Sequence, residues 1–110
     1  MTKYALFFSY TPETWSKMIT NPTDRREAVQ KIMATLGGSL DSLYFMFGDH
    51  DGFAVFDVPD ADAAAAAAIA VTSSGAFGNV ETHELIEPGH LPDVLAKAKA
   101  VTGSYQAPGS

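Results

Sequence analysis

The chain has 110 residues, no cysteine and a formal net charge of −6 at pH 7, and 46% of its residues are hydrophobic. This fits one folded domain with one core and excludes disulfides, a thiol nucleophile and cysteine-based metal sites. Seven Lys and Arg among thirteen acids argue against nucleic acid or an anionic membrane as partner, and no apolar run approaches the ~20 residues that cross a bilayer. The N-terminal residues lack a signal-peptide layout, so we expect a cytoplasmic protein.

The first third of the chain predicts a strand followed by two short helices. The run Tyr4–Tyr10 is apolar at both odd and even positions, which is typical of a strand buried on both faces. Thr11-Pro12-Glu13 is a helix start with Thr11 as N-cap, and Asn21-Pro22 interrupts that helix. A second helix restarts at Thr23-Asp24, carries an apolar stripe and ends at Gly37-Gly38.

The rest of the chain predicts three more strands and two more helices. Turn residues, the run of alanines and the spacing of leucine and valine place their boundaries. The expected elements are a strand over 40–47, a glycine-bracketed turn over 48–52, a strand over 53–58, an alanine-rich helix over 61–71, a strand over 79–86 and a helix over 91–101. Residues 102–110 are expected to form a flexible tail.

The order of these elements predicts an α+β fold, a ferredoxin-like βαββαβ domain over residues 1–90 with a C-terminal helix. Right-handed crossovers give the strand order 4-1-3-2. Two helices cover only one face of such a sheet, and the other face is also apolar, so we expect a second copy to cover it in a sheet-to-sheet homodimer or higher homo-oligomer. The helix over 91–101 should dock on an edge strand of its own or the partner subunit.

Several short motifs carry a resemblance to a known family. They are Ser9-Tyr10-Thr11, Arg25-Arg26-x-Ala28, Leu36-Gly37-Gly38, the segment 47–51 and the alanine-rich helix ending in Ser74-Gly75. In order and spacing, residues 3–88 resemble the GYD-domain family. The resemblance implies a bacterial protein of the dimeric α+β barrel class, without an established activity. The chain departs from the family at His50, where members usually carry a tyrosine.

The predicted topology brings several chemically useful side chains to one end of the sheet. His50 is the candidate catalytic residue, because its imidazole titrates near neutrality and two carboxylates flank it. The alternatives are a turn residue that only stabilises the hairpin and a metal ligand, which would need further ligands. The candidate ligand-binding residues are Tyr10, Trp15, Tyr44, Asp49 and Asp51. The aromatic ones are either packing residues or the wall of an apolar pocket for a small apolar or aromatic ligand.

Other polar residues give weaker signals. His83 is expected roughly 20 Å along the last strand from the site, and His90 beyond its far end, so no three-histidine metal site is expected within one subunit. A Glu81–His83 group facing its counterpart across a dimer remains a candidate for a divalent cation. Arg25 and Arg26 form either a solvated helix face or a contact with a carboxylate ligand. No phosphate-loop or nucleophile-elbow motif occurs, and we expect no cofactor.

Three functions remain open from the sequence. The first is a homo-oligomeric protein that binds a small molecule in an apolar pocket near Tyr10, Trp15 and His50. The second is a cofactor-free enzyme, similar to a monooxygenase or isomerase, in which His50 or Tyr10 moves a proton. The third is a structural module whose assembly is its only role. The absence of a convergent catalytic group favours the first and the third.

Overall fold

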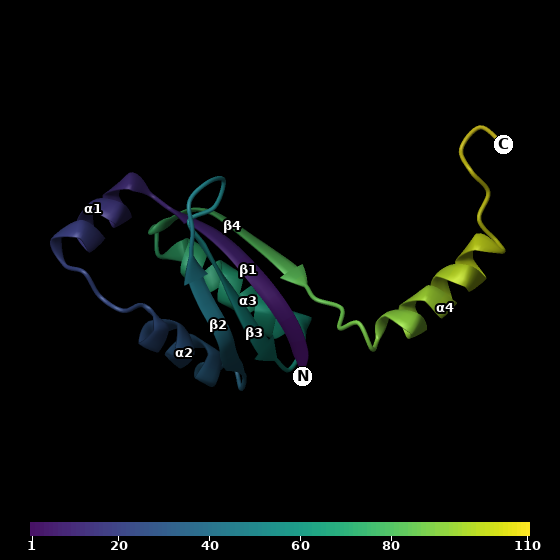
Figure 1. Ribbon diagram of the computed structural model, residues 1–110, viewed down its shortest axis with the longest axis horizontal. Helices are drawn as coiled ribbons and strands as arrows, with labels where there is room; N and C mark the ends of the chain where they lie inside the picture. Colours follow the sequence, from purple (N-terminus) through teal and green to yellow (C-terminus); the bar gives the residue numbers. More distant parts are fainter.

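The computed structural model describes residues 1–110 and contains four strands and four helices (Figure 1). Their bounds are β1 Thr2–Tyr10, α1 Pro12–Thr20, α2 Arg26–Thr35, β2 Ser39–Phe45, β3 Gly52–Val58, α3 Ala61–Ser73, β4 Phe77–Glu84 and α4 Leu91–Thr102. None of the helices is both long enough and apolar enough to cross a lipid bilayer.

The four strands form one antiparallel sheet in the order β2-β3-β1-β4, which reads 4-1-3-2 from the opposite edge. The two apolar strands β1 and β3 are therefore central, and the more polar β2 and β4 are edges, as their composition predicts. β2 ends two residues earlier than expected, and Phe47 lies fully exposed in the turn that follows. β4 begins and ends two residues before its predicted bounds.

The helix boundaries follow local capping chemistry. The Thr11 hydroxyl accepts a hydrogen bond from the Thr14 amide at 3.3 Å, as the predicted N-cap of α1. The Asp60 carboxylate accepts from the Ala63 amide at 3.0 Å and caps α3 in the same way. After α2, Gly37 adopts a φ of +76°, a left-handed conformation that favours glycine and ends the helix.

The core lies on the face of the sheet that the helices cover. Every second residue of β1 points to this face, and Tyr4, Leu6 and Phe8 are all buried there. From β3, Phe56 and Val58 are almost completely enclosed. On the helix side of the core, α3 contributes small buried residues, Ala64 and Ala67, which let the helix approach the sheet closely.

The opposite face of the sheet carries no helix and has an aromatic part. Phe7 on β1 packs against Phe53 on β3 with ring centroids 5.5 Å apart, and Tyr44 on β2 packs against Phe53 at 5.7 Å. Phe7 and Phe53 stay partly exposed, and 61% of Tyr44 is exposed. We call this surface, formed by Phe7, Phe53 and Tyr44 with the neighbouring His50, the open aromatic face.

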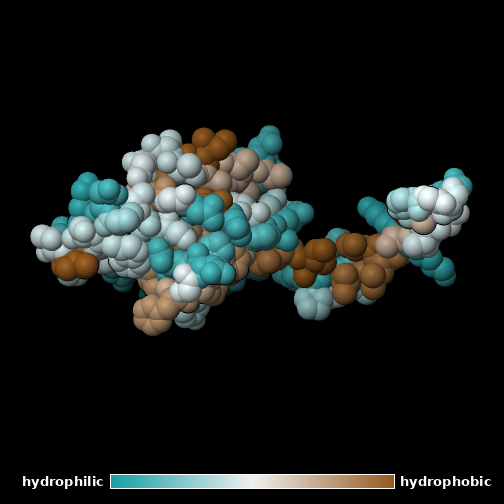
Figure 2. All heavy atoms as spheres, turned by 90° about the horizontal axis from the view of Figure 1, so that it is seen from above, coloured by the Kyte–Doolittle hydropathy of each residue, from teal (hydrophilic) through white to brown (hydrophobic).

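The C-terminal helix α4 does not dock on its own subunit. It projects away from the sheet (Figure 1), none of its residues is buried, and it lengthens the molecule to 58 Å along its longest axis. Hydrophobic atoms gather along this arm (Figure 2), where Leu85, Ile86, Leu91 and Leu95 are exposed. Of the two docking places expected from the sequence, the edge strand of the same chain is therefore not used.

Candidate ligand-binding pocket

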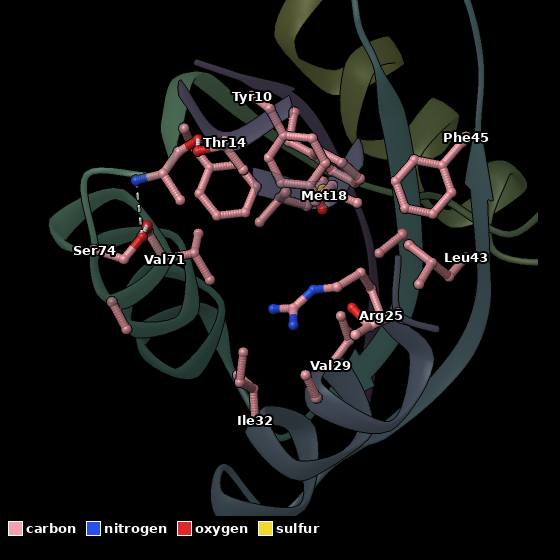
Figure 3. A pocket seen from close by; sticks show the side chains of 18 of the residues that line it. Tyr10, Thr14, Met18, Arg25, Val29, Ile32, Leu43, Phe45, Val71 and Ser74 are labelled. Carbon is pink, nitrogen blue, oxygen red and sulfur yellow. Dashed lines mark hydrogen bonds between the residues drawn. The ribbon is translucent and has the colours of Figure 1, made fainter. Parts of the chain in front are cut away.

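A cavity of about 1000 Å³ lies between the helix-covered face of the sheet and the helices α1, α2 and α3 (Figure 3). Seventeen of its 25 lining residues are hydrophobic. Pockets of this size and character are typical of small-molecule sites. The pocket therefore belongs to one subunit and lies on the side of the sheet away from the open aromatic face.

Four aromatic rings line the pocket at one end of the sheet. Phe8 lies at the centre, with its ring centroid 5.3 Å from Tyr10, 5.9 Å from Phe45 and 5.7 Å from Phe77. Gly52 makes this arrangement possible, because a Cβ at that position would collide with the Phe8 ring. The strands β1, β2 and β4 each contribute to this aromatic wall, which therefore has a rigid support.

The pocket exists because the surrounding helices present small or medium side chains. On α3, Ala67 packs in the core, whereas Ala70, three residues further on, lines the cavity with a methyl group and leaves space that a larger side chain would fill. On α2, Val29 and Ile32 form the opposing apolar wall (Figure 3). The alanine run is thus both a strong helix former and the reason for an open volume above the sheet.

The charged residues of the pocket are all positive. Arg25 and Lys17 are among the lining residues, and no Asp or Glu is, although the chain as a whole has thirteen acids. The side chain of Arg25 points into the cavity (Figure 3), and it forms no salt bridge with any carboxylate. Arg26 lies outside this pocket, beside Gln30 and the β2 edge.

Tyr10 is the predicted site residue that does line the pocket. Burial raises the pKa of its phenol above the usual 10.0, and the nearby Arg25 guanidinium offsets part of that rise. The phenol is therefore protonated at neutral pH. It can donate a hydrogen bond to a ligand in the cavity, but it is not a base under these conditions.

Asp51 joins the predicted residues Tyr10 and Trp15. One carboxylate oxygen, Oδ2, accepts hydrogen bonds from the Tyr10 amide at 2.8 Å and from the Trp15 indole Nε1 at 3.1 Å. The two rings meet edge to face with centroids 5.2 Å apart. Trp15 and Asp51 do not line the cavity themselves. They fix the position of Tyr10 by contacts outside the cavity.

His50 lies on the other face of the sheet. Its side chain is only 21% exposed and packs over Phe7 with ring centroids 5.4 Å apart. The adjacent Asp51 points the other way, because its carboxylate accepts a hydrogen bond from the Trp15 indole while the His50 ring lies on Phe7. The structure therefore places His50 outside the cavity that Tyr10 lines, on the opposite face of the sheet.

His50 and His83 are brought together, which the sequence argument did not foresee. Both imidazoles approach the same Glu81 oxygen, at 3.5 Å from His50 Nε2 and 3.6 Å from His83 Nε2. The turn after β2 folds over Phe7, which pairs with Glu81 on β4, and this closes the distance. His90 lies elsewhere, beside Asp93 on α4. No group of three His, Cys, Asp or Glu residues has the geometry to hold a metal ion.

The remaining two predicted site residues also lie outside the pocket. Tyr44 belongs to the open aromatic face and packs on Phe53. Asp49 is exposed in the turn, where its backbone carbonyl accepts a hydrogen bond from the Ser9 hydroxyl at 3.3 Å. Neither side chain can contact a ligand bound between the sheet and the helices.

Several pocket residues were interpreted differently or missed in the sequence. Phe45, Val29, Ile32 and Val71 read as ordinary core residues, because an apolar stripe looks the same whether it fills a core or lines a cavity. The available signal was the alanine run, whose methyl groups pack closely on the sheet at Ala64 and Ala67 but leave space at Ala70. The sequence alone did not distinguish the pocket residue Arg25 from the adjacent Arg26.

The fold and the pocket define an α+β protein with one antiparallel sheet, helices on one face and an apolar cavity between them. The family model for the GYD domain matches residues 4–95. The chain therefore belongs to the GYD domain family, as the motifs in the sequence predict. Among curated proteins no match was found.

Proposed function

We propose that the protein binds a small molecule in the pocket between its sheet and helices α1, α2 and α3. The observation that carries this proposal is the cavity of about 1000 Å³ with its largely apolar lining. An empty cavity of this size lowers the stability of the fold, because its lining side chains lose packing contacts. A ligand with an apolar body would restore those contacts.

The pocket supports binding better than catalysis. Of the two residues expected to move protons, His50 lies across the sheet from the cavity, and the raised pKa of Tyr10 keeps its phenol protonated. An enzyme built on this pocket would have Tyr10 as a proton donor and no general base beside it. A binding role needs neither a proton donor nor a general base.

The open aromatic face supports the second part of the proposal, a homodimer with ferredoxin-like subunits packed sheet to sheet. Phe7 and Phe53 on the two central strands, with Tyr44 beside them, form an apolar surface that no helix of the same chain covers. A two-fold pair buries this surface in both copies at once. The exposed leucines of α4 supply a second apolar contact, for which the partner subunit is the remaining docking place.

Filling the pocket tests the binding proposal. Ala70 lines the cavity, so Ala70→Trp should place an indole in it, whereas Ala66→Trp adds the same group to an exposed position of α3 outside the cavity. With the neutral fluorescent probe N-phenyl-1-naphthylamine, the wild type and Ala66→Trp should show saturable binding, and Ala70→Trp should lose it. Equal binding by the two variants would place the probe elsewhere and contradict the proposal.

A further inference from the structure

We propose that the ligand of this pocket is an amphipathic monocarboxylate, an apolar chain or ring system that ends in a single carboxylate, with Arg25 as its binding partner. The inference rests on the proposed binding function and names the chemical class of the ligand. It is carried by the position of Arg25, whose guanidinium points into a largely apolar cavity that no protein carboxylate lines (Figure 3).

An unpaired guanidinium in such a place favours an anion. Arg25 is solvent-exposed, so its guanidinium is hydrated in the free protein, but an anion bound in the cavity would gain charge-assisted hydrogen bonds from it. The ion pairs of this chain all involve other cations, and Asp51, the carboxylate nearest to Tyr10, is already engaged by the Tyr10 amide and the Trp15 indole. No carboxylate of the chain forms an ion pair with Arg25, so its guanidinium is free to bind an anionic ligand.

The number of donors favours a head group with one negative charge. Arg25 offers two parallel N–H groups that match a carboxylate, and the Tyr10 phenol beside it is protonated and can donate to the same oxygen. Three other hydroxyls of the lining already donate to backbone carbonyls: Thr14 to Ala76, Thr20 to Ser16 and Ser74 to Val71. A phosphate with two charges would need further cations, and Lys17 is the only other cation among the lining residues.

The rest of the pocket fits the apolar body of such a molecule. Beyond Arg25 the cavity is bounded by the aromatic wall of Phe8, Phe45 and Phe77 and by the aliphatic side chains of α2. No Asp or Glu lines it, so an incoming carboxylate meets no like charge there, although the chain carries a net charge of −6. The local positive charge thus selects an anion against the overall charge of the protein.

A matched pair of probes separates the head group from the apolar body. Decanoate and decan-1-ol carry the same chain, and their dissociation constants can be measured by isothermal titration calorimetry at pH 7.5, below the micelle concentration of decanoate. The wild type should bind decanoate at least about 10-fold more tightly than decan-1-ol, because a hydrogen bond to a charged group contributes that much. Arg25→Met should remove this preference and leave the affinity for decan-1-ol within about twofold.

The adjacent arginine supplies the control. Arg26→Met makes the same change in net charge but lies outside the pocket, so it should leave the preference for decanoate intact. If decan-1-ol binds as tightly as decanoate, or if both variants weaken decanoate equally, the carboxylate inference is overturned while the binding function stands. If neither probe binds the wild type up to its solubility limit in water, the binding function itself fails with it.

Discussion

The two faces of the sheet are both apolar, yet the structure treats them in opposite ways. On one face, Phe8 is buried under helices and borders a pocket. On the other face, its neighbour Phe7 lies partly exposed among Phe53 and His50. Two adjacent phenylalanines in one strand thus belong to different surfaces. Whether an apolar residue in a strand packs in the subunit's own core or faces an outside partner thus depends on its odd or even position along the strand.

The largest effect is expected on the buried face. Phe8→Asp places a carboxylate among Tyr10, Phe45 and Phe77 with no partner, so the free energy of unfolding should fall by more than about 4 kcal/mol. Chemical denaturation monitored by circular dichroism measures this loss. A variant that keeps the unfolding midpoint of the wild type would show that this face is not the core.

The next effect concerns the support behind the pocket. Asp51→Ala removes two hydrogen bonds and leaves the Tyr10 amide and the Trp15 indole without their acceptor, which should cost about 2–3 kcal/mol. Since Trp15 is the only tryptophan, its emission should shift as the indole loses its partner. Asp51→Asn, which retains an acceptor oxygen, should lose less. An emission spectrum unchanged in Asp51→Ala would argue against this contact.

A smaller effect on the fold, with a larger one on assembly, is expected from the open aromatic face. Phe53→Asp makes the same change as Phe8→Asp on the opposite side of the sheet, where the side chain is only half-buried. The variant should stay folded, and its dimer dissociation constant should rise at least about 30-fold, as for a central interface residue. Sedimentation velocity at several concentrations measures this. Wild-type protein that is monomeric at low micromolar concentration would contradict the dimer.

The smallest effect is expected from the arm. Deleting residues 91–110 should weaken the dimer by about 10-fold, because the exposed leucines of α4 would lose their contact with the partner. The fold of the single subunit should not change, since α4 packs on none of it. Deleting only residues 104–110 is the control and should have no effect. Equal dissociation constants for both truncations would mean that α4 is not docked in the dimer.

The elements of this fold were predictable because each has a local signal. Thr11 caps the helix that it was expected to cap, Gly37 lies in the Gly37-Gly38 stop of α2, and the apolar strands β1 and β3 lie in the centre of the sheet. The first turn of α2 was placed slightly too early, because Asp24 accepts from the Arg26 amide just ahead of the helix. Such signals depend only on residues close in sequence.

The site was less predictable because it depends on side-chain direction. The topology correctly brings the segment around Asp51 to Tyr10 and Trp15, but the direction of each side chain in the turn follows from its backbone, which the sequence does not reveal. His50 and Asp51 were therefore assigned to one site although they point to opposite faces. Arg25 and Arg26 were treated alike for the same reason, and only the structure separates them.

The most direct test of the difference between the two faces is the number of ligands per assembly, measured by native mass spectrometry with N-phenyl-1-naphthylamine. A pocket on the helix-covered face occurs once in each subunit, and an interface on the open aromatic face joins two subunits. We expect a dimer that binds two probe molecules. A dimer that binds a single probe would place the site between the two sheets, and a monomer that binds none would contradict both assignments.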